Sequence, residues 1–147
     1  MVPRAAIVAE ALSWVGTPYA DLQGLKGPQG GVDCVYLLLG VAQAVGALPA
    51  TYPRPVYSPQ WHLHHDRERY REELEALGGR AKAWTDRHPG DILLFRFGRV
   101  ASHAAILVTP TEIVHAHSRR GVLRQPIPSA WWARLVAVYT FPGVEGG

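Results

Sequence analysis

The chain has 147 residues, 48% of them hydrophobic, and carries a net charge of +3, and this length predicts a single domain spanning residues 1–147. No apolar run approaches the roughly 20 residues that cross a bilayer, so we expect no membrane insertion. The arginines are scattered rather than arranged in a stripe with interleaved aromatic residues, so we expect no nucleic-acid partner.

The first part of the chain, residues 1–80 or so, is predicted to be helical. Apolar residues at three-to-four spacing predict a helix over residues 3–15. The almost wholly apolar run 34–45 predicts a central buried helix, which Gly46 would end. After a proline-rich connector, a third and amphipathic helix is predicted over residues 66–77.

The last part of the chain, residues 90–142 or so, changes to a hydrophobic period of two, which predicts strands. Glycine- and proline-containing turns separate about five of them, and such short turns favour antiparallel hairpins. Helices followed by an antiparallel sheet predict an α+β fold. The expected strands are residues 91–97, 102–109, 112–117, 121–127 and 135–141.

Cys34 is the only cysteine, so no internal disulfide can form. It directly follows Asp33 at the predicted start of the central helix. Free N–H groups and the positive dipole end at a helix start favour a thiolate and can hold an oxyanion. A lone cysteine is also commonly a small buried apolar residue, so a catalytic interpretation requires a partner that transfers protons.

The chain has seven histidines, and two of them fall on strands that we expect to be neighbours. His103 opens one strand, and the small alanines that follow it would let the cysteine helix approach closely. His115 lies on the next strand, where its imidazole could orient that of His103 from the same face of the sheet. His117 lies two residues further along and shares this face, so it is the rival candidate for the third site residue.

Together these segments resemble the NlpC-type papain-like cysteine peptidases, which cleave peptidoglycan stem peptides. The resemblance runs in the family's order from about residue 5 to 140. It implies a papain-like fold, in which the cysteine lies on a central helix packed against the sheet. The matching segments are Gly16-Thr17-Pro18-Tyr19, Asp33-Cys34, Pro89-Gly90-Asp91, Ser102-His103-Ala104 and Val114-His115-Ala116.

The resemblance also implies a role for each site residue. Cys34 corresponds to the nucleophile, His103 to the general base and His115 to the residue that orients the base. Tyr19 corresponds to a tyrosine that lies beside the cysteine and can assist the oxyanion, and Ser102 falls on the oxyanion or substrate side. Such chemistry requires no metal and no cofactor, and we expect neither.

The segment after the nucleophile departs from the family pattern Asp-Cys-Ser-Gly-Leu, because it reads Asp33-Cys34-Val35-Tyr36-Leu37. Asp33 is expected to cap the helix or to face the substrate rather than to act as a catalytic acid. Tyr36 stands in place of glycine and Val35 in place of a small polar residue. We expect Tyr36 either to fill the space below the helix or to narrow the cleft, which affects substrate preference and activity.

The proline-rich segment 53–61 and the helix after it resemble the phage and gene-transfer-agent variety of the family. This implies phage-tail partners and delivery of the enzyme to the cell wall by a tail or virion. The first residues show no basic segment and apolar stretch of a secretory signal peptide, so we expect synthesis in the cytoplasm without one.

The expected function is therefore that of a cysteine endopeptidase acting on peptidoglycan stem peptides, and the resemblance implies the bond between D-glutamate and the diamino acid. Two alternatives use the same fold: a structural tail component with little turnover, and an amidase or acyltransferase with the same Cys-His dyad. A third alternative is a metal site, whose candidate ligands are His62, His64, His65, His88 and Asp66.

Overall fold

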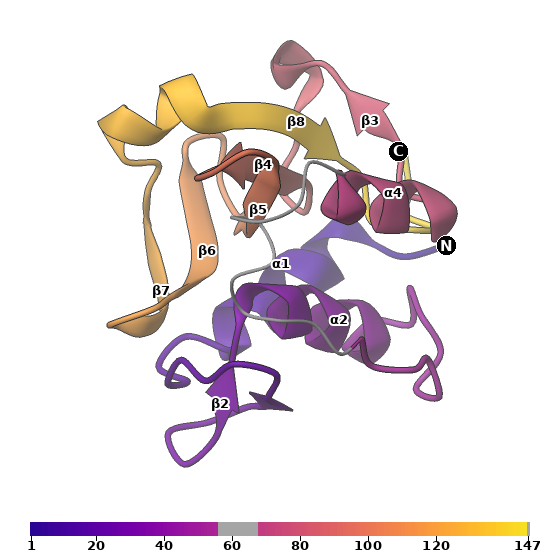
Figure 1. The fold of residues 1–147 in the computed structure, drawn as a ribbon. Helices are drawn as coiled ribbons and strands as arrows, with labels where there is room; N and C mark the ends of the chain where they lie inside the picture. Colours follow the sequence, from indigo (N-terminus) through magenta and orange to yellow (C-terminus); the bar gives the residue numbers. More distant parts are fainter. Residues whose placement is uncertain (56–67, 147) are drawn as a thin grey trace.

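The computed structural model describes residues 1–55 and 68–146, in which helices come first and an antiparallel sheet follows (Figure 1). The α+β class expected from the sequence is confirmed. Each of the three predicted helices is present. The first two are one to three residues shorter than predicted, and the predicted start of the third, residues 66–67, lies outside the described residues. The helices are α1 (Arg4–Ser13), α2 (Cys34–Ala44) and α4 (Arg69–Ala76).

The main sheet has six strands in the order β3-β8-β4-β5-β6-β7, and all of its pairings are antiparallel. The five predicted strands correspond to β4–β8. The sixth, β3, was missed because a strand of two residues has no alternation to detect. The strands are β3 (Ala81–Lys82), β4 (Ile92–Arg96), β5 (Ala101–Leu107), β6 (Glu112–His117), β7 (Gly121–Pro126) and β8 (Leu135–Tyr139).

Short elements fill the connections that the sequence predicted to be loops. The glycine-rich loop before Cys34 contains a two-stranded hairpin, and two 3-10 helices flank the main sheet. A hairpin of two-residue strands and single-turn helices carry too little periodicity to be predicted. These elements are β1 (Gly24–Leu25), β2 (Gly31–Val32), η1 (Trp84–Asp86) and η2 (Ser129–Arg134).

Side chains of the sheet alternate between two apolar clusters. Ala104 and Ile106 of β5 belong to the larger cluster, which includes Leu37 and Val41 of α2. Ala105 and its neighbours on the opposite face form a smaller cluster covered by η2. Figure 1 shows α1 and α2 on one side of the sheet, and α2 packs directly against β5. Ala104 therefore allows the close approach of the cysteine helix that the sequence predicted, whereas Ala105 faces the other cluster.

Asp33 is the N-cap of α2, as expected. Its carboxylate accepts hydrogen bonds from the backbone N–H of Tyr36 at 2.9 Å and from that of Leu22 at 2.8 Å. It therefore satisfies one free donor of the helix start and also holds the preceding loop. In the middle of α2, a Cβ added at Gly40 would lie 2.5 Å from the ring of Trp14, so the absent side chain makes room for the tryptophan.

Asp91 joins three elements through a buried carboxylate. Its side chain is fully buried and accepts ion pairs from Arg4 of α1 at 2.8 Å and from Lys82 of β3 at 2.9 Å. The backbone N–H of His88 donates to the same carboxylate at 2.7 Å. Gly90 precedes it with a φ of +95°, a conformation that favours glycine. The Pro-Gly-Asp segment is thus a structural feature that anchors the start of β4.

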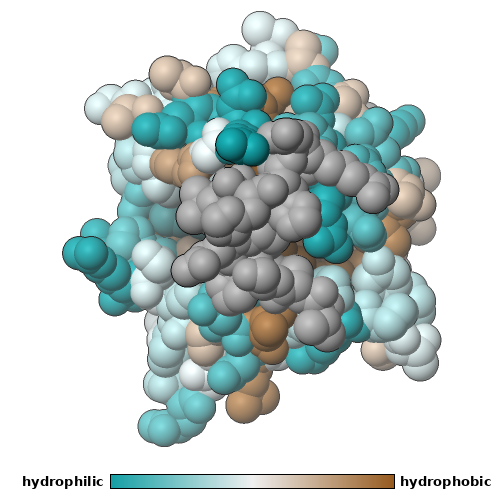
Figure 2. Space-filling view, viewed as in Figure 1, coloured by the Kyte–Doolittle hydropathy of each residue, from teal (hydrophilic) through white to brown (hydrophobic). Residues whose placement is uncertain are grey.

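The surface shown in Figure 2 is mixed, with hydrophilic residues predominating and hydrophobic ones in small separate groups. Large side chains with high exposure are Met1, Val15, Leu25 and Trp132. Within residues 1–55 and 68–146, every helix is too short or too polar to cross a bilayer.

Candidate active site

A cleft of about 280 Å³ opens at the N-terminal end of α2, between the loop that precedes β1 and strands β5 and β6. Every residue that the sequence singled out for the site lines this one cleft. The structure therefore brings together residues that are up to 98 positions apart, from 19 to 117, in the chain. These residues are Tyr19, Asp33, Cys34, Ser102, His103, His115 and His117.

His103 and His115 form a hydrogen-bonded pair across β5 and β6. Nε2 of His103 lies 3.0 Å from Nδ1 of His115, and the two rings are nearly perpendicular at 88°. The antiparallel pairing of the two strands places both imidazoles on one face, as the sequence predicted. Because Nε2 of His103 is engaged, its Nδ1 is the ring nitrogen left to exchange a proton with another group.

His117 lines the same cleft, but its side chain is hydrogen-bonded to the turn that follows β6. Its Nδ1 accepts hydrogen bonds from the backbone N–H of Arg119 at 3.1 Å and of Arg120 at 3.2 Å. Its ring lies 6.1 Å from that of His115, measured between centroids. The geometry therefore favours His115 over His117 as the partner of His103.

Cys34 is partly buried at the first position of α2. Its Sγ accepts a hydrogen bond of 3.2 Å from the hydroxyl of Tyr70 and lies 3.9 Å from the carbonyl oxygen of Ser102. Burial raises the pKa of the thiol to about 11, and the Asp33 carboxylate adds to this, while the Tyr70 hydrogen bond and backbone N–H groups oppose it. Burial, together with the Asp33 carboxylate, therefore outweighs the hydrogen-bond donors at the sulfur in this state, and the resting residue is a neutral thiol rather than the thiolate expected from the helix start.

The histidine pair is neutral for the same reason. Burial lowers the pKa of His103 to about 3, with His115 and His117 adding to the shift. Burial also lowers the pKa of His115 to about 4, and Gln125 on β7 opposes this without completing a hydrogen bond to the buried Nε2. The resting site thus holds an uncharged thiol and two uncharged imidazoles in one cleft.

These lowered pKa values predict a loss of stability on acidification. Between pH 6.5 and 4.5 the unfolded chain binds protons at His103 and His115, whereas the folded chain does not. Proton binding therefore stabilises the unfolded state, and the free energy of unfolding falls. Stability is complete above the unfolded pKa and falls as the pH drops towards the folded values of about 3 and 4. We expect a loss of about 2 kcal/mol for each histidine over this window, measured by urea unfolding at the two pH values.

The matched control for this experiment is the variant His115→Asn, whose unfolding free energy should fall less steeply over the same pH window. The other histidines are common to both proteins, so the difference in slope reports on position 115. Equal slopes in the two proteins would contradict the prediction.

The other predicted residues form the walls of the cleft. Tyr19 donates a hydrogen bond from its hydroxyl to Asp21 at 3.1 Å, and burial raises the pKa of this phenol. Two backbone hydrogen bonds to Val122 at the start of β7 hold the loop that carries Tyr19. The N–H of Gly16 donates to the carbonyl of Val122 at 3.0 Å, and the N–H of Val122 donates to the carbonyl of Thr17 at 2.8 Å. Oγ of Ser102 accepts from the N–H of Phe97 at 3.2 Å, so its hydroxyl stabilises the β4–β5 turn.

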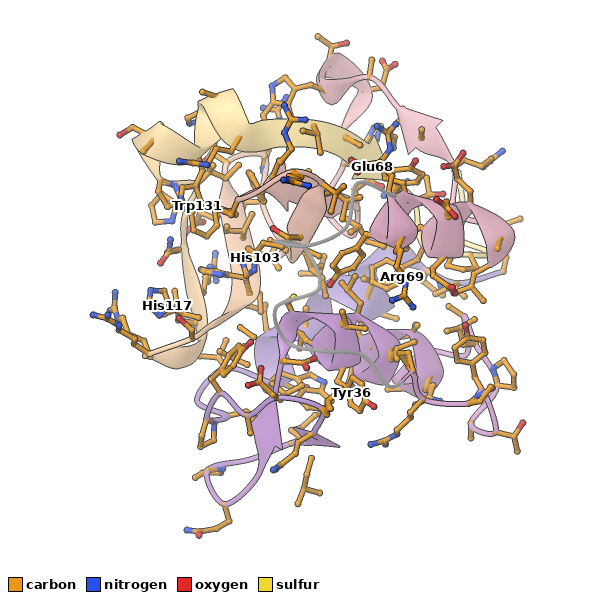
Figure 3. All side chains as sticks on the ribbon, viewed as in Figure 1. Tyr36, Glu68, Arg69, His103, His117 and Trp131 are labelled. Atoms are coloured by element: carbon orange, nitrogen blue, oxygen red, sulfur yellow. The ribbon has the colours of Figure 1, made fainter. Side chains whose placement is uncertain are left out.

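The two unusual residues after Cys34 point in different directions. Tyr36 is buried, and its hydroxyl donates to the carbonyl oxygen of Pro55 at 2.7 Å. Figure 3 shows Tyr36 on the side of α2 away from His103, so it fills space below the helix and does not narrow the cleft. Val35 lines the cleft instead, and its branched side chain makes that wall apolar.

Two residues at the site were not recognised in the sequence. The sequence places Tyr70 only within the amphipathic helix predicted over residues 66–77, yet its hydroxyl reaches Sγ of Cys34. Trp131 of η2 packs edge-on against both imidazoles, with ring centroids 5.3 Å from His103 and 5.1 Å from His115 (Figure 3). Neither residue has a local signal, because Tyr70 reaches the cysteine sulfur, and Trp131 the cleft, from elements distant in the chain.

The part of the chain that the structure describes holds no group of three or more His, Cys, Asp or Glu side chains that could bind a metal ion. Four of the five candidate metal ligands, His62, His64, His65 and Asp66, lie outside the described residues.

Together, the order of helices and strands and the cleft at the start of α2 define a papain-like α+β domain, and the chain has the fold of NlpC/P60 domains. The NlpC/p60 domain of the peptidoglycan hydrolase SagA superposes with a TM-score of 0.59 at 22% identity, covering 93% of this chain and 97% of that one. RipD from Mycobacterium tuberculosis, described as a non-catalytic NlpC/p60 domain protein, superposes with a TM-score of 0.60 at 14% identity, covering 93% and 95%.

In sequence, the chain is similar to the probable endopeptidase Rv2190c of Mycobacterium tuberculosis. The two are 36% identical over 126 residues, which cover 85% of this chain and 26% of the relative. The chain thus spans about a quarter of the length of the curated relatives it matches. No family model matches the sequence.

Proposed function

We propose that this chain is a cell-wall cysteine endopeptidase that hydrolyses peptidoglycan stem peptides. The observation that carries the proposal is the 3.0 Å hydrogen bond between His103 and His115 in the cleft that Cys34 also lines. The similarity to a probable endopeptidase and to a peptidoglycan hydrolase domain supports both the reaction class and the substrate.

In the proposed mechanism, Nδ1 of His103 takes the thiol proton as Sγ of Cys34 attacks the peptide carbonyl. The ring of His103 then carries two N–H groups and a positive charge. The N–H at Nε2 donates to Nδ1 of His115, and this hydrogen bond stabilises the imidazolium. The backbone N–H of Cys34 holds the oxyanion, and the hydroxyl of Tyr19 turns from Asp21, its acceptor in the resting site, to donate to the oxyanion as well. His103 next protonates the leaving amine, the amine departs, and the same imidazole activates the water that hydrolyses the thioester.

Proton transfer from a thiol to an imidazole inside the cleft suits the neutral resting state. A preformed thiolate–imidazolium pair would have to overcome the burial that raises the pKa of Cys34 and lowers that of His103. Entry of a polar peptide makes the cleft more polar. The negative charge that develops on the sulfur is then stabilised by hydrogen-bond donors aimed at it, and the positive charge on His103 is stabilised by His115.

The finer assignments belong to the same proposal. The scissile bond is that between D-glutamate and the diamino acid, and the enzyme is associated with a phage-type tail that brings it to the wall. Both rest on the resemblance in the sequence. Most of the segment 53–61, on which the tail association depends, lies outside the described residues. If the tail association is right, this chain should co-purify with tail particles.

A binding role without turnover is the second candidate, and one observation favours it. The pKa of Cys34, raised to about 11, leaves the thiol uncharged in the resting state, and RipD shows that this fold occurs in a non-catalytic protein. An amidase or acyltransferase with the same dyad would differ from the endopeptidase only in the groups joined or released.

Digestion of purified peptidoglycan tests these candidates directly. We expect the wild-type protein to release stem-peptide fragments whose new amino termini, identified by mass spectrometry, are those of the diamino acid. Cys34→Ala should abolish release because it removes the attacking atom. Wild-type protein that binds peptidoglycan and releases nothing would support the binding role, whereas fragments with other new termini would identify a different bond or an amidase.

A further inference from the structure

We propose that Tyr70 is a thiolate-stabilising residue, whose hydroxyl, carried by α4, activates Cys34 through a hydrogen bond to its sulfur. The proposal rests on the proposed function in treating Cys34 as the nucleophile. It adds a fourth element, α4, to a site that the sequence assigned to the cysteine helix and two strands.

The contact itself is a hydrogen bond with a defined direction. The hydroxyl of Tyr70 donates to Sγ of Cys34 at 3.2 Å. A hydrogen bond donated to a sulfur becomes stronger when the sulfur becomes an anion, because hydrogen bonds to charged groups are roughly twice as strong as neutral ones. The Tyr70 hydroxyl therefore favours the thiolate over the thiol.

The other side of the sulfur faces an acceptor. The carbonyl oxygen of Ser102 lies 3.9 Å from Sγ, at a distance that suits a weak hydrogen bond from the thiol. Loss of the thiol proton would turn this contact into a repulsion. Ser102 thus holds the resting thiol, and Tyr70 compensates for the loss of that contact when the proton leaves.

The remaining groups around Sγ show why such a donor is needed. The Asp33 carboxylate disfavours a thiolate, and the backbone N–H groups of Ala104 and Cys34 favour it. Across the cleft lie Tyr19, Asp21, His117 and the neutral imidazoles of His103 and His115. Within the described residues that line the cleft there is no Lys or Arg. The Tyr70 hydroxyl is the side-chain donor with a defined hydrogen bond to the sulfur.

The fold holds Tyr70 in place from both ends of α4. Tyr70 lies in the first turn and is 7% exposed. Just before the helix, the Glu68 carboxylate accepts from the backbone N–H of Ala101 at 3.1 Å, which ties the start of α4 to the start of β5 (Figure 3). At the other end, the hydroxyl of Tyr139 donates to Glu75 at 2.9 Å. The hydroxyl of Tyr70 is thus positioned by contacts to the same sheet that carries His103.

The test is the rate at which iodoacetamide alkylates Cys34 between pH 7 and 9, followed by intact mass. Because Cys34 is the only cysteine, the added mass reports on this sulfur alone. In Tyr70→Phe we expect the thiol pKa to rise by about one unit. The thiolate fraction then falls about tenfold while each thiolate becomes about threefold more nucleophilic, so alkylation slows about three- to fourfold.

Tyr36→Phe is the matched control, because it also removes the hydroxyl of a buried tyrosine, one that donates to the carbonyl oxygen of Pro55 and does not touch the sulfur. It should alkylate at the wild-type rate. A second variant keeps the ring in place: a fluorotyrosine inserted at position 70 has a more acidic hydroxyl and donates more strongly, so the thiol pKa should fall. The fluorotyrosine variant also tests the role of the Tyr70 hydroxyl if Tyr70→Phe does not fold.

Unchanged or faster alkylation in folded Tyr70→Phe, or no shift with fluorotyrosine, would overturn the proposal. Alkylation needs no peptidoglycan, so the outcome is independent of whether the chain is a peptidase. Where hydrolysis is measurable, Tyr70→Phe should lower kcat more than it raises KM, because the hydroxyl acts on the sulfur and not on substrate binding.

Discussion

His103→Ala is expected to lower the rate of stem-peptide hydrolysis by about 10²- to 10⁴-fold, the range for removal of a general acid–base group. The variant leaves Cys34 without the imidazole that accepts its proton and that later protonates the leaving amine. The raised thiol pKa makes this loss severe, because little thiolate is available without a base. Steady-state kinetics on the peptide identified in the digestion would measure the effect.

Variants of the other two histidines test the assignment of roles. His115→Ala should cost less than His103→Ala, since it removes the residue that orients the base and stabilises its charge. His117→Ala should cost least, because that ring is bound to the turn at Arg119 and Arg120. If His117→Ala proves more damaging than His115→Ala, the third residue of the site is wrongly assigned. Circular dichroism of each variant separates lost chemistry from lost folding.

Asp91→Ala is expected to destabilise the protein by about 3–5 kcal/mol, the usual cost of breaking a buried ion pair by removing one partner. The carboxylate is fully buried, and its two cationic partners, Arg4 and Lys82, are only 16% and 12% exposed. Without it both charges remain in an apolar environment, where Arg4 already has one buried nitrogen without a partner among the described residues. Chemical unfolding of the variant and the wild type would measure the loss.

Glu112→Ala provides the matched control for the effect of Asp91, because it also removes an acid that pairs with an arginine. The Glu112–Arg124 pair spans 3.0 Å between exposed side chains, at 32% and 43% exposure. Water already solvates both charges there, so only a small fraction of the Asp91 effect is expected. Comparable losses in the two variants would mean that burial does not set the strength of the Asp91 cluster.

The parts of the fold with a strong repeating pattern could be predicted from the residues. The apolar run after Cys34 predicted α2 to within one residue, and alternation predicted β6 with its observed bounds. Both patterns show which side chains of a segment are buried, and this can be read from the order of residues within that segment. Two-residue strands such as β3 lack any such pattern, because their pairing depends on a distant partner.

For the site, the residues alone placed the cysteine at a helix start and two histidines on neighbouring strands, since helix caps and hairpins are local features. Three properties depended on the tertiary structure. The charge state of Cys34 follows from burial, which outweighs the hydrogen-bond donors around its sulfur. The choice of His115 over His117 follows from which ring reaches Nε2 of His103.

The third property is the approach of Tyr70 and Trp131 from distant elements. Desolvation and contacts across the fold have no local signature in a sequence, because they arise only when separate segments pack together. The direction of Tyr36 illustrates the same point: its position two residues after the nucleophile left open whether it narrowed the cleft, and packing against Pro55 places it outside.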